Sequence, residues 1–543
     1  MKRAVILVGA VLLSLILTGC AEKKEIKTFS AFMAVPGKVM PSDNRIMNKI
    51  AEKIGAKAEI SWLEAQTPQE RIQVMIESEE YPDFIDGSDA TGMLIEAEAL
   101  IPLEHYLDDY PNLKAYLSEQ EWNSLKKEDG HIYFIPQFSV INGTSMITNH
   151  SDEAFWIQKR VLKWAGYPKI KTLDEYFDLI NAYLKENPES ENGQRNLGFE
   201  ILCDDWRYFC LENPPQFLAG YPNDGCAVVN PDTLEASVYD HLPEARKYYK
   251  RLCAEYEKGI IDPETFTMSY EEYLEKLASG CVLGMVDQGW QFRGAEDVLR
   301  EQGMDDRTYV PLGLTISKEV EGAYQSKPAL NTGNGVGISV SCEDVEGALQ
   351  FLNDLLDPQI QLLRSWGEEG IDYQVGEDGV FYRTEEQRRK AGDAQWQLEN
   401  RCSYSYFPHK EGMLQDGINA ASPEQQPGEY AATLSETDRE VLEAYGYEKW
   451  TDFLGEAREN APWFPLYSAI ESWGEDTSYG QAKEAMDRVK KEWLPKIIMA
   501  GKKQFAQKWT QYQKAYRQEV DVEAYEQELT EEVRRRVTRS QKS

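Results

Sequence analysis

The chain has 543 residues, with 93 acidic against 58 basic side chains and a formal net charge of −35. Its length exceeds that of a usual single domain and can supply two large hydrophobic cores. The acidic excess disfavours binding to nucleic acid or to anionic lipid headgroups, and it favours solubility.

The first twenty residues have the pattern of an export signal. Lys2 and Arg3 precede an apolar run over 4–17, which is shorter than the roughly 20 residues that a membrane-spanning helix needs. The run has the length of a secretory hydrophobic region. We therefore expect residues 1–19 to be a signal peptide that is removed. Loss of the two basic residues then lowers the net charge from −35 to −37.

A cysteine closes this signal and is followed directly by a charged stretch. The order Leu17-Thr18-Gly19-Cys20 resembles the processing box of bacterial lipoproteins, in which the thiol accepts a diacylglycerol. We expect Cys20 to be lipidated and 20–27 to be a short tether. The protein would then lie on the outer face of the cell membrane, attached through its N-terminal lipid alone, since several buried acyl chains hold a protein firmly. An ordinary signal peptide with an incidental cysteine is the alternative.

Hydrophobic periodicity predicts alternating strands and helices at the start of the mature chain. The expected strands are 28–35, 56–63 and 81–90, and the expected helices are 44–55 and 67–78. The second helix begins with a capping box, because Thr67 is followed by Pro68 and by a glutamate at the third helical position. This β-α-β-α-β order predicts a mainly parallel sheet covered by helices.

The remaining chain continues the mixture of strands and helices. Further strands are expected at 129–140, 281–290, 309–316 and 333–340, and further helices at 152–166, 172–186, 241–259 and 342–357. The segment 422–440 reads as an irregular loop. We expect an α/β fold with two lobes, each built on a mainly parallel sheet. The first lobe comprises 28–136 and 309–357, the second 137–308 and 358–475, and 476–543 forms a charged C-terminal helical segment.

Cysteine and histidine spacing indicates neither a disulfide framework nor a metal centre. Seven cysteines follow Cys20 and include no C-x-x-C pair, so we expect mostly buried free thiols. Bridges within 203–253 remain an open alternative. The five histidines are scattered singly, so no zinc spacing is present and no metal site is predicted.

Several stretches, in order from residue 44 to 375, resemble the extracellular solute-binding protein family 1, the sugar-binding lipoproteins of bacterial ABC importers, and especially its larger LplA-like branch. The stretches are NRIMNKIAEKIGAKAEI (44–60), QERIQVMIESEEYPDFI (69–85), DGHIYFIP (129–136), KRVLKWAGYPKIKTLDEYFDLI (159–180), EYEKGIIDPETF (255–266) and SWGEEGIDYQV (365–375). The resemblance implies a two-lobed, type II periplasmic-binding-protein-like fold. It also implies a monomer that captures an oligosaccharide between its lobes and delivers it to the permease subunits of an ABC importer, without catalysis.

Two places depart from the family pattern. His131 stands where lysine is usual, and Phe134 stands where glycine is usual. The segment 187–199 resembles a loop that holds Ca²⁺ in some members. Here Asn187, Glu189 and Glu191 replace shorter aspartate ligands and the glycine comes one place late, whereas Ca²⁺ loops need closely spaced oxygen ligands and a well-placed glycine. We expect a solvated loop and no cofactor, with a Ca²⁺ ion as the alternative.

Sugars offer apolar C–H faces and a ring of hydroxyls, which aromatic and carboxylate side chains can contact. Side chains at strand ends are the best candidates, because open α/β sheets bind ligands there. The predicted ligand-binding residues are Trp62 after the second strand, Asp86 and Asp89 after the third, Trp290 after the strand 281–290, Trp206, and the pair Trp366 and Tyr373. The resemblance implies ring stacking at Trp290 and hydroxyl contacts at the two aspartates.

Two other classes of function remain open. With 93 acidic residues, composition cannot exclude the pair of carboxylates that a lipid-anchored glycoside hydrolase needs. A surface adhesin or scaffold without a soluble ligand is the other alternative. Release of new reducing ends would distinguish the hydrolase, and absence of any sugar ligand would indicate the scaffold.

Overall fold

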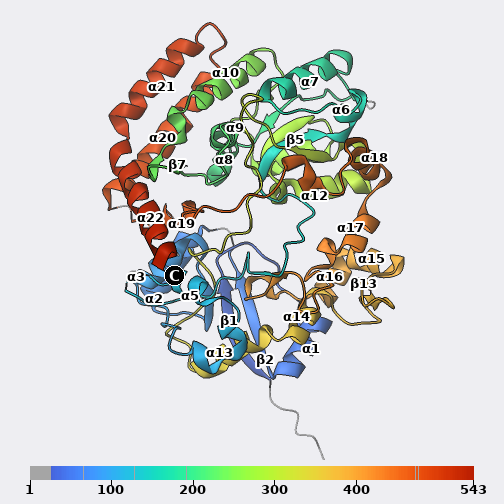
Figure 1. The fold of residues 1–543 in the computed structure, drawn as a ribbon, viewed down its shortest axis with the longest axis vertical. Coiled ribbons are helices and arrows are strands. Elements are labelled where there is room, and N and C mark those ends of the chain that lie inside the picture. Colours follow the sequence, from blue (N-terminus) through green and yellow to red (C-terminus); the bar gives the residue numbers. More distant parts are fainter. Residues whose placement is uncertain are drawn as a thin grey trace, which may run out of the picture.

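The computed structural model describes residues 26–64, 66–127, 129–190, 193–470, 473–474 and 476–542. Cys20, the signal peptide and most of the tether lie outside these residues. Figure 1 shows two lobes joined by several crossing segments, with the C-terminal helices along one side. No helix among the described residues combines the length and the apolar character needed to cross a bilayer.

The first lobe is built on a four-stranded sheet in the order β11-β3-β1-β2. The strands are β1 (Lys27–Met33), β2 (Ala56–Trp62), β3 (Phe84–Asp86) and β11 (Gly337–Ile338). The first three pair in parallel and β11 pairs antiparallel at the edge, so the mainly parallel sheet is confirmed here. Its helices are α1 (Arg45–Ile54), α2 (Pro68–Ser78), α3 (Thr91–Glu96), α4 (Pro111–Lys114), α5 (Glu119–Ser124), α13 (Val345–Leu355) and α14 (Pro358–Ser365).

Local signals in this lobe act as the sequence predicts. Thr67 caps α2 with the full capping box, and Gly55 ends α1 in the left-handed conformation at φ +76°. The chain after α14 adds β12 (Gln374–Val375), β13 (Phe381–Tyr382), α15 (Glu385–Ala391) and α16 (Ala394–Asn400). Arg45 of α1 joins this addition to the lobe through ion pairs with Glu368 and Asp372 at 2.6 and 2.7 Å.

The second lobe carries a sheet in the order β10-β5-β9-β6. The strands are β5 (Glu153–Gln158), β6 (Glu200–Ile201), β9 (Gly284–Gln288) and β10 (Tyr309–Leu312). β5 pairs antiparallel with both β9 and β10, so the expectation of a mainly parallel sheet is wrong for this lobe. Its main helices are α6 (Lys159–Trp164), α7 (Leu173–Glu186), α8 (Phe209–Glu212), α9 (Pro214–Leu218), α10 (Pro243–Glu257), α11 (Tyr270–Ala278) and α12 (Gly289–Glu301).

Two of the expected lobe boundaries are wrong. β10 was placed in the first lobe, but it pairs with β5 and its side chains pack in the second core. The chain after 358 was placed in the second lobe, yet Ile360, Leu363, Tyr404 and Phe407 pack in the core of the first. Glu429 of α17 (Pro427–Thr433) still accepts a hydrogen bond from the Arg383 amide of the first lobe, and the chain returns to the second lobe at α18 (Glu436–Tyr445), which contacts α6.

Three expected elements also differ. The segment 152–166 is strand β5 followed by the short helix α6, because its apolar run is enclosed on both faces. The segment 129–140 forms isolated bridging contacts such as Ile135 with Val336 and no continuous strand. The expected loop 422–440 contains α17 and the first half of α18, since Ser435 and Asp438 form a capping box.

The C-terminal helices brace the second lobe. α20 (Ser478–Ile498), α21 (Phe505–Glu519) and α22 (Val522–Lys542) pack on α10 and on the hairpin of β7 (Val228–Asn230) and β8 (Glu235–Ser237). Lys490 of α20 is buried between Asp240 and Glu212, with Nζ–O distances of 3.2 and 3.4 Å. The expected helical segment is therefore an integral part of the second core.

Candidate functional site

The carboxyl ends of three strands form one edge of the first sheet. Met33 at the end of β1 lies opposite Trp62 of β2 and also opposite Asp86 of β3. Trp62 and Asp86 are therefore two strands apart in one row, about 10 Å by the usual strand spacing. Open α/β sheets bind ligands at this edge. The structure thus brings two of the predicted residues to the edge where they were expected.

Asp86 is enclosed at this edge and holds a polar partner. Its carboxylate accepts hydrogen bonds from the Ser88 amide at 2.8 Å and from Gln137 Nε2 at 2.6 Å. Burial raises the pKa of Asp86, while the hydrogen bonds from Ser88 and Gln137 act in the opposite direction. Because only 3% of Asp86 is exposed, the carboxylate mainly orients Gln137 on the crossing segment. Its direct contact with a ligand stays a prediction.

Asp89 follows in the 3₁₀ turn Ser88–Ala90 and has an exposed side chain. Surrounding protein still restricts solvent around the carboxylate enough to raise the pKa of Asp89, and the positive charge of Lys483 opposes that rise. Lys483 belongs to α20, so the C-terminal helices place a cation near this edge of the first lobe. A ligand role for Asp89 also stays a prediction.

A row of aromatic rings runs from Trp62 along the first lobe. Trp62 contacts Tyr406, Tyr406 contacts Phe138, and Phe138 contacts His409, with ring centroids 5.7, 5.3 and 5.8 Å apart. Phe138 and His409 also line a cavity of about 360 Å³. The cavity is further lined by polar side chains, among them Gln361, Ser405, Lys410, Glu411 and Gln425. Mixed aromatic and polar walls of this kind suit a ligand with both C–H faces and hydroxyls.

In the second lobe, Trp290 begins α12 directly after β9 and is 49% exposed. The preceding residue must be small, since a Cβ on Gly289 would lie 2.5 Å from the His150 carbonyl oxygen. Below the turn, Asp287 is fully buried and accepts hydrogen bonds from Tyr273 at 2.7 Å and from Gln291 at 2.6 Å. Burial raises the pKa of Asp287 to about 6. This network fixes the start of α12 and therefore the position of the indole.

Trp206 lies against Trp290 although the two are far apart in sequence. Their rings are stacked with centroids 6.0 Å apart and an interplanar angle of 13°, and Trp206 is 52% exposed. The Arg207 guanidinium lies 4.6 Å from the Trp206 ring and 4.0 Å from the Tyr270 ring. Two half-exposed indoles in one stack form an unusual exposed apolar patch, which is typical of a binding surface. We call these two side chains the tryptophan platform.

Two predicted ligand-binding residues are enclosed in the structure. Trp366 and Tyr373 are 1% and 4% exposed and pack against each other and against Phe381. The Trp366 indole donates to the Ala420 carbonyl oxygen at 3.0 Å. These contacts indicate a packing role for both rings, and a contact of either ring with a ligand stays a prediction.

The loop that resembles a Ca²⁺ site is engaged in its own hydrogen bonds. Asn187 Nδ2 donates to the Tyr183 carbonyl oxygen, and Asn196 Nδ2 donates to the Asn187 carbonyl oxygen. Glu189 is exposed, and Glu191 lies outside the described residues. The described part therefore supplies no converging set of ligand atoms, and the solvated loop stays a prediction.

Sequence reasoning missed Tyr406, Phe138, Gln137 and Arg207. Gln137 and Phe138 lie inside the expected strand 129–140 rather than at its end, and Tyr406 and Arg207 lie in no expected element, so the search at strand ends did not single them out. Arg207 had one available signal, since it directly follows Trp206 and a cation beside an indole is a common pairing. The seven cysteines of the described residues are free thiols in this structure, and five of them are buried.

Comparison with known proteins gives three bacterial relatives. No protein-family model matches the chain. The chain is 28% identical over 273 residues to the fructooligosaccharide ABC transporter substrate-binding protein FusA of Streptococcus pneumoniae, a match that spans 47% of this chain and 48% of FusA. It is 22% identical over 407 residues to lipoprotein LipO of Bacillus subtilis, covering 70% and 77% of the two chains. The polygalacturonan/rhamnogalacturonan-binding protein YtcQ of Bacillus subtilis is 21% identical over 415 residues, covering 71% and 76%.

Solved structures share the fold over nearly the whole chain. A FusA EF-hand mutant in complex with fructo-nystose superposes with a TM-score of 0.67 at 17% identity, covering 95% of this chain and all of that one. The alginate-binding protein AlgQ2 without calcium superposes with a TM-score of 0.63 at 16% identity, covering 94% and 98%. The fold is that of the two-lobed solute-binding proteins. Among the relatives, FusA is an ABC transporter substrate-binding protein and YtcQ is a polysaccharide-binding protein, which agrees with the expected resemblance to sugar-binding proteins of ABC importers.

Proposed function

We propose that the protein is the extracellular solute-binding component of an ABC importer and captures an oligosaccharide without chemical change. The observation that carries this proposal is the tryptophan platform of Trp206 and Trp290, two half-exposed stacked indoles held at a strand end. The proposal is supported by the fold shared with carbohydrate-binding proteins and by the sugars that the relatives FusA and YtcQ bind. Capture of the sugar involves no catalytic step.

The two lobes divide the work of binding. The platform of the second lobe stacks on the C–H face of a sugar ring. The row from Trp62 to His409 and the adjoining cavity of the first lobe bind further rings, and the buried pair of Asp86 and Gln137 holds the crossing segment beside them. A ligand that contacts both lobes favours a closed state, because closure is stabilised only by contacts absent from the open state.

Attachment at the membrane is also proposed. Cys20 carries the lipid, and the monomeric protein lies on the outer face of the cell and meets the permease subunits of its importer there. We expect Cys20→Ser to release the protein from cells into the medium, since one terminal lipid group supplies the membrane affinity. Fractionation with an acylation assay checks this. Continued acylation of the variant would refute the anchor.

A binding assay tests the ligand class. The purified protein is titrated with kestose, nystose and oligogalacturonates, and the mixtures are analysed for free sugar and for reducing ends. Binding without new reducing ends is the expected result. New reducing ends would indicate the glycoside hydrolase instead, and no binding across the panel would favour the adhesin or scaffold.

Trp290→Ala tests the platform itself. About half of a tryptophan side chain that can bury 150–250 Å² is available to the ligand, so about 100 Å² at roughly 25 cal/mol per Å² gives about 2.5 kcal/mol. Affinity should fall by up to roughly 70-fold. Trp164→Ala is the matched control, because Trp164 is 39% exposed on α6 and packs on Tyr183. Equal effects of the two variants would remove Trp290 from the site.

A further inference from the structure

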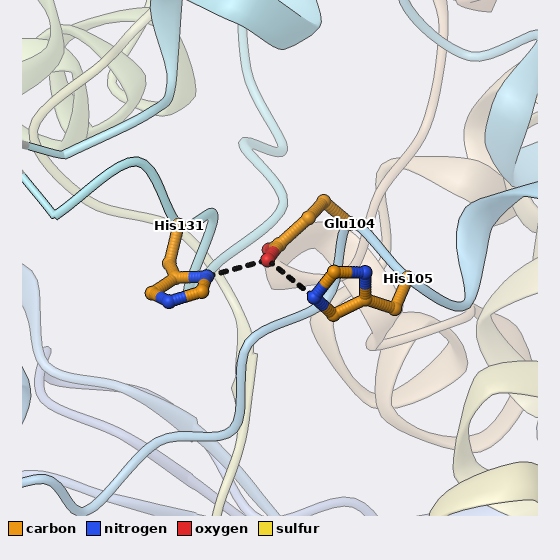
Figure 2. A group of neighbouring side chains, drawn as sticks. All are labelled: Glu104, His105 and His131. Atoms are coloured by element: carbon orange, nitrogen blue, oxygen red, sulfur yellow. Dashed lines mark hydrogen bonds and ion pairs between the residues drawn. The ribbon is translucent and has the colours of Figure 1, made fainter.

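Two histidines and a glutamate converge on the surface of the first lobe (Figure 2). Glu104 Oε1 lies 2.5 Å from His131 Nδ1 and 3.2 Å from His105 Nε2. All three ligand atoms lie within 4.8 Å of one another. The spacing of the five histidines in the sequence predicts isolated side chains. That interpretation is wrong for this pair, because folding brings two loops together.

The loops that carry the cluster are fixed to each other. The Leu103 amide donates to the Ile132 carbonyl oxygen at 2.8 Å, and the Ile132 amide donates to Glu104 Oε2 at 3.1 Å. The second bond orients the carboxylate so that its other oxygen faces the imidazoles. Asp129 accepts from the His131 amide at 2.9 Å and holds the turn. The side chains are thus positioned by backbone contacts, as the outer contacts of metal ligands commonly are.

We propose that Glu104, His105 and His131 form a binding site for a divalent transition-metal ion of the Zn²⁺ type. Imidazole nitrogen and carboxylate oxygen are ligands that Zn²⁺ accepts, and three protein ligands leave a further position for water. This site is independent of the proposed sugar site and uses none of its residues.

The distances from the Glu104 carboxylate to the two imidazole nitrogens suit a Zn²⁺ ion after a small movement of the side chains. Zn–N and Zn–O bonds of about 2.0–2.1 Å place tetrahedral ligand atoms about 3.3 Å apart. The His105–Glu104 distance of 3.2 Å already fits. The His131–Glu104 distance must widen by about 0.8 Å from 2.5 Å, which rotation of the carboxylate can supply. His105 is exposed, so its ring is free to follow the ion.

A bound ion would connect the loop at 103–106 with the turn at 129–132. Because the unfolded chain does not hold these residues together, binding stabilises the folded state by mass action. The melting temperature should therefore rise with the concentration of ZnCl₂.

The test uses the purified protein with any histidine tag removed, ZnCl₂ as the probe, and isothermal titration together with thermal melting. We expect one Zn²⁺ per chain at this site, and at least tenfold weaker binding with loss of the thermal shift in His131→Asn and in Glu104→Gln. His241→Asn is the matched control, since His241 is an exposed histidine against Tyr516 in the other lobe. It should bind like the unmodified protein.

Two results would overturn the proposal. One is an isotherm for His131→Asn that equals that of the unmodified protein. The other is a Co²⁺-loaded protein whose absorption shows a thiolate charge-transfer band, which would place the ion at a cysteine. Circular dichroism of each variant confirms that the fold is retained, so that lost binding reports on the ligands. Sugar affinity is measured in parallel and should not change.

Discussion

The buried cation of the C-terminal segment allows a quantitative prediction. Lys490 is 3% exposed and its only side-chain charge partners among the described residues are Glu212 and Asp240. Burial lowers the pKa of Lys490, but these two carboxylates outweigh that effect and raise it well above its ordinary value. The change Lys490→Met leaves two acids buried without their cation. Removing one partner of a buried pair costs about 3–5 kcal/mol, and we expect that loss in the free energy of unfolding at pH 8.

The loss of unfolding free energy in Lys490→Met should depend on pH. Burial raises the pKa of Glu212 to about 7, against the opposing charge of Lys490. A raised carboxyl pKa contributes stability that is complete below the unfolded pKa of about 4.3 and is lost as the pH rises through the folded value. At pH 5 Glu212 is mostly protonated in the folded state, so the variant should lose less there than at pH 8.

Urea unfolding at pH 5 and pH 8 measures both quantities, and limited proteolysis of α21 and α22 reports whether the segment detaches. Lys496→Met is the matched control on the same helix, because Lys496 is exposed and pairs with Glu492 at 2.6 Å. Exposed pairs of this kind contribute about 0.3–0.5 kcal/mol. Adding Asp240→Asn to Lys490→Met should recover part of the loss. Equal, pH-independent losses for Lys490→Met and Lys496→Met would refute the reasoning.

Three further outcomes follow from the geometry. Glu153 is buried, its Oε1 has no hydrogen-bond partner, and burial raises the pKa of Glu153 well above the ordinary value. The free energy of unfolding should therefore rise by about 1–3 kcal/mol in Glu153→Gln at pH 8 and by progressively less toward pH 5. Urea unfolding measures this, and an equal effect at both pH values would contradict the raised pKa. Gly289→Ala should weaken sugar binding at least fivefold, because the added Cβ displaces the start of α12; unchanged binding by titration would show that the turn can adapt. Trp366→Phe should lower the free energy of unfolding by about 1–3 kcal/mol, because the hydrogen bond to the Ala420 carbonyl oxygen is lost, and sugar affinity should stay within twofold. A larger loss of affinity in the same titration would show that Trp366 contacts the sugar.

Local sequence determined much of the first lobe. The cap at Thr67, the glycine at 55 and the apolar spacing of α1 each act within a few residues, so they could be read directly. Strand ends were also readable, which is why Trp62, Asp86 and Trp290 were expected at sheet edges and are found there.

Elsewhere the local signal was ambiguous. The segment 152–166 has apolar residues that suit either a helix or a strand buried on both faces. Its first half forms a strand because it pairs with β9 and β10, whose residues lie more than 120 positions away in the sequence. The boundary errors at 309 and 358 have the same origin, because lobe membership is set by which core a segment packs against.

By itself the sequence determined the acidic charge, the first parallel sheet and the resemblance that indicated a sugar-binding class, and it predicts an export signal that ends at Cys20. Tertiary structure alone decided that Trp206 lies on Trp290, that Trp366 is enclosed, and that His105 meets His131 beside Glu104. The physical reason is that caps and periodicity act over one or two helical turns. Stacking, enclosure and convergence of ligand atoms depend instead on segments that meet only when the chain has folded.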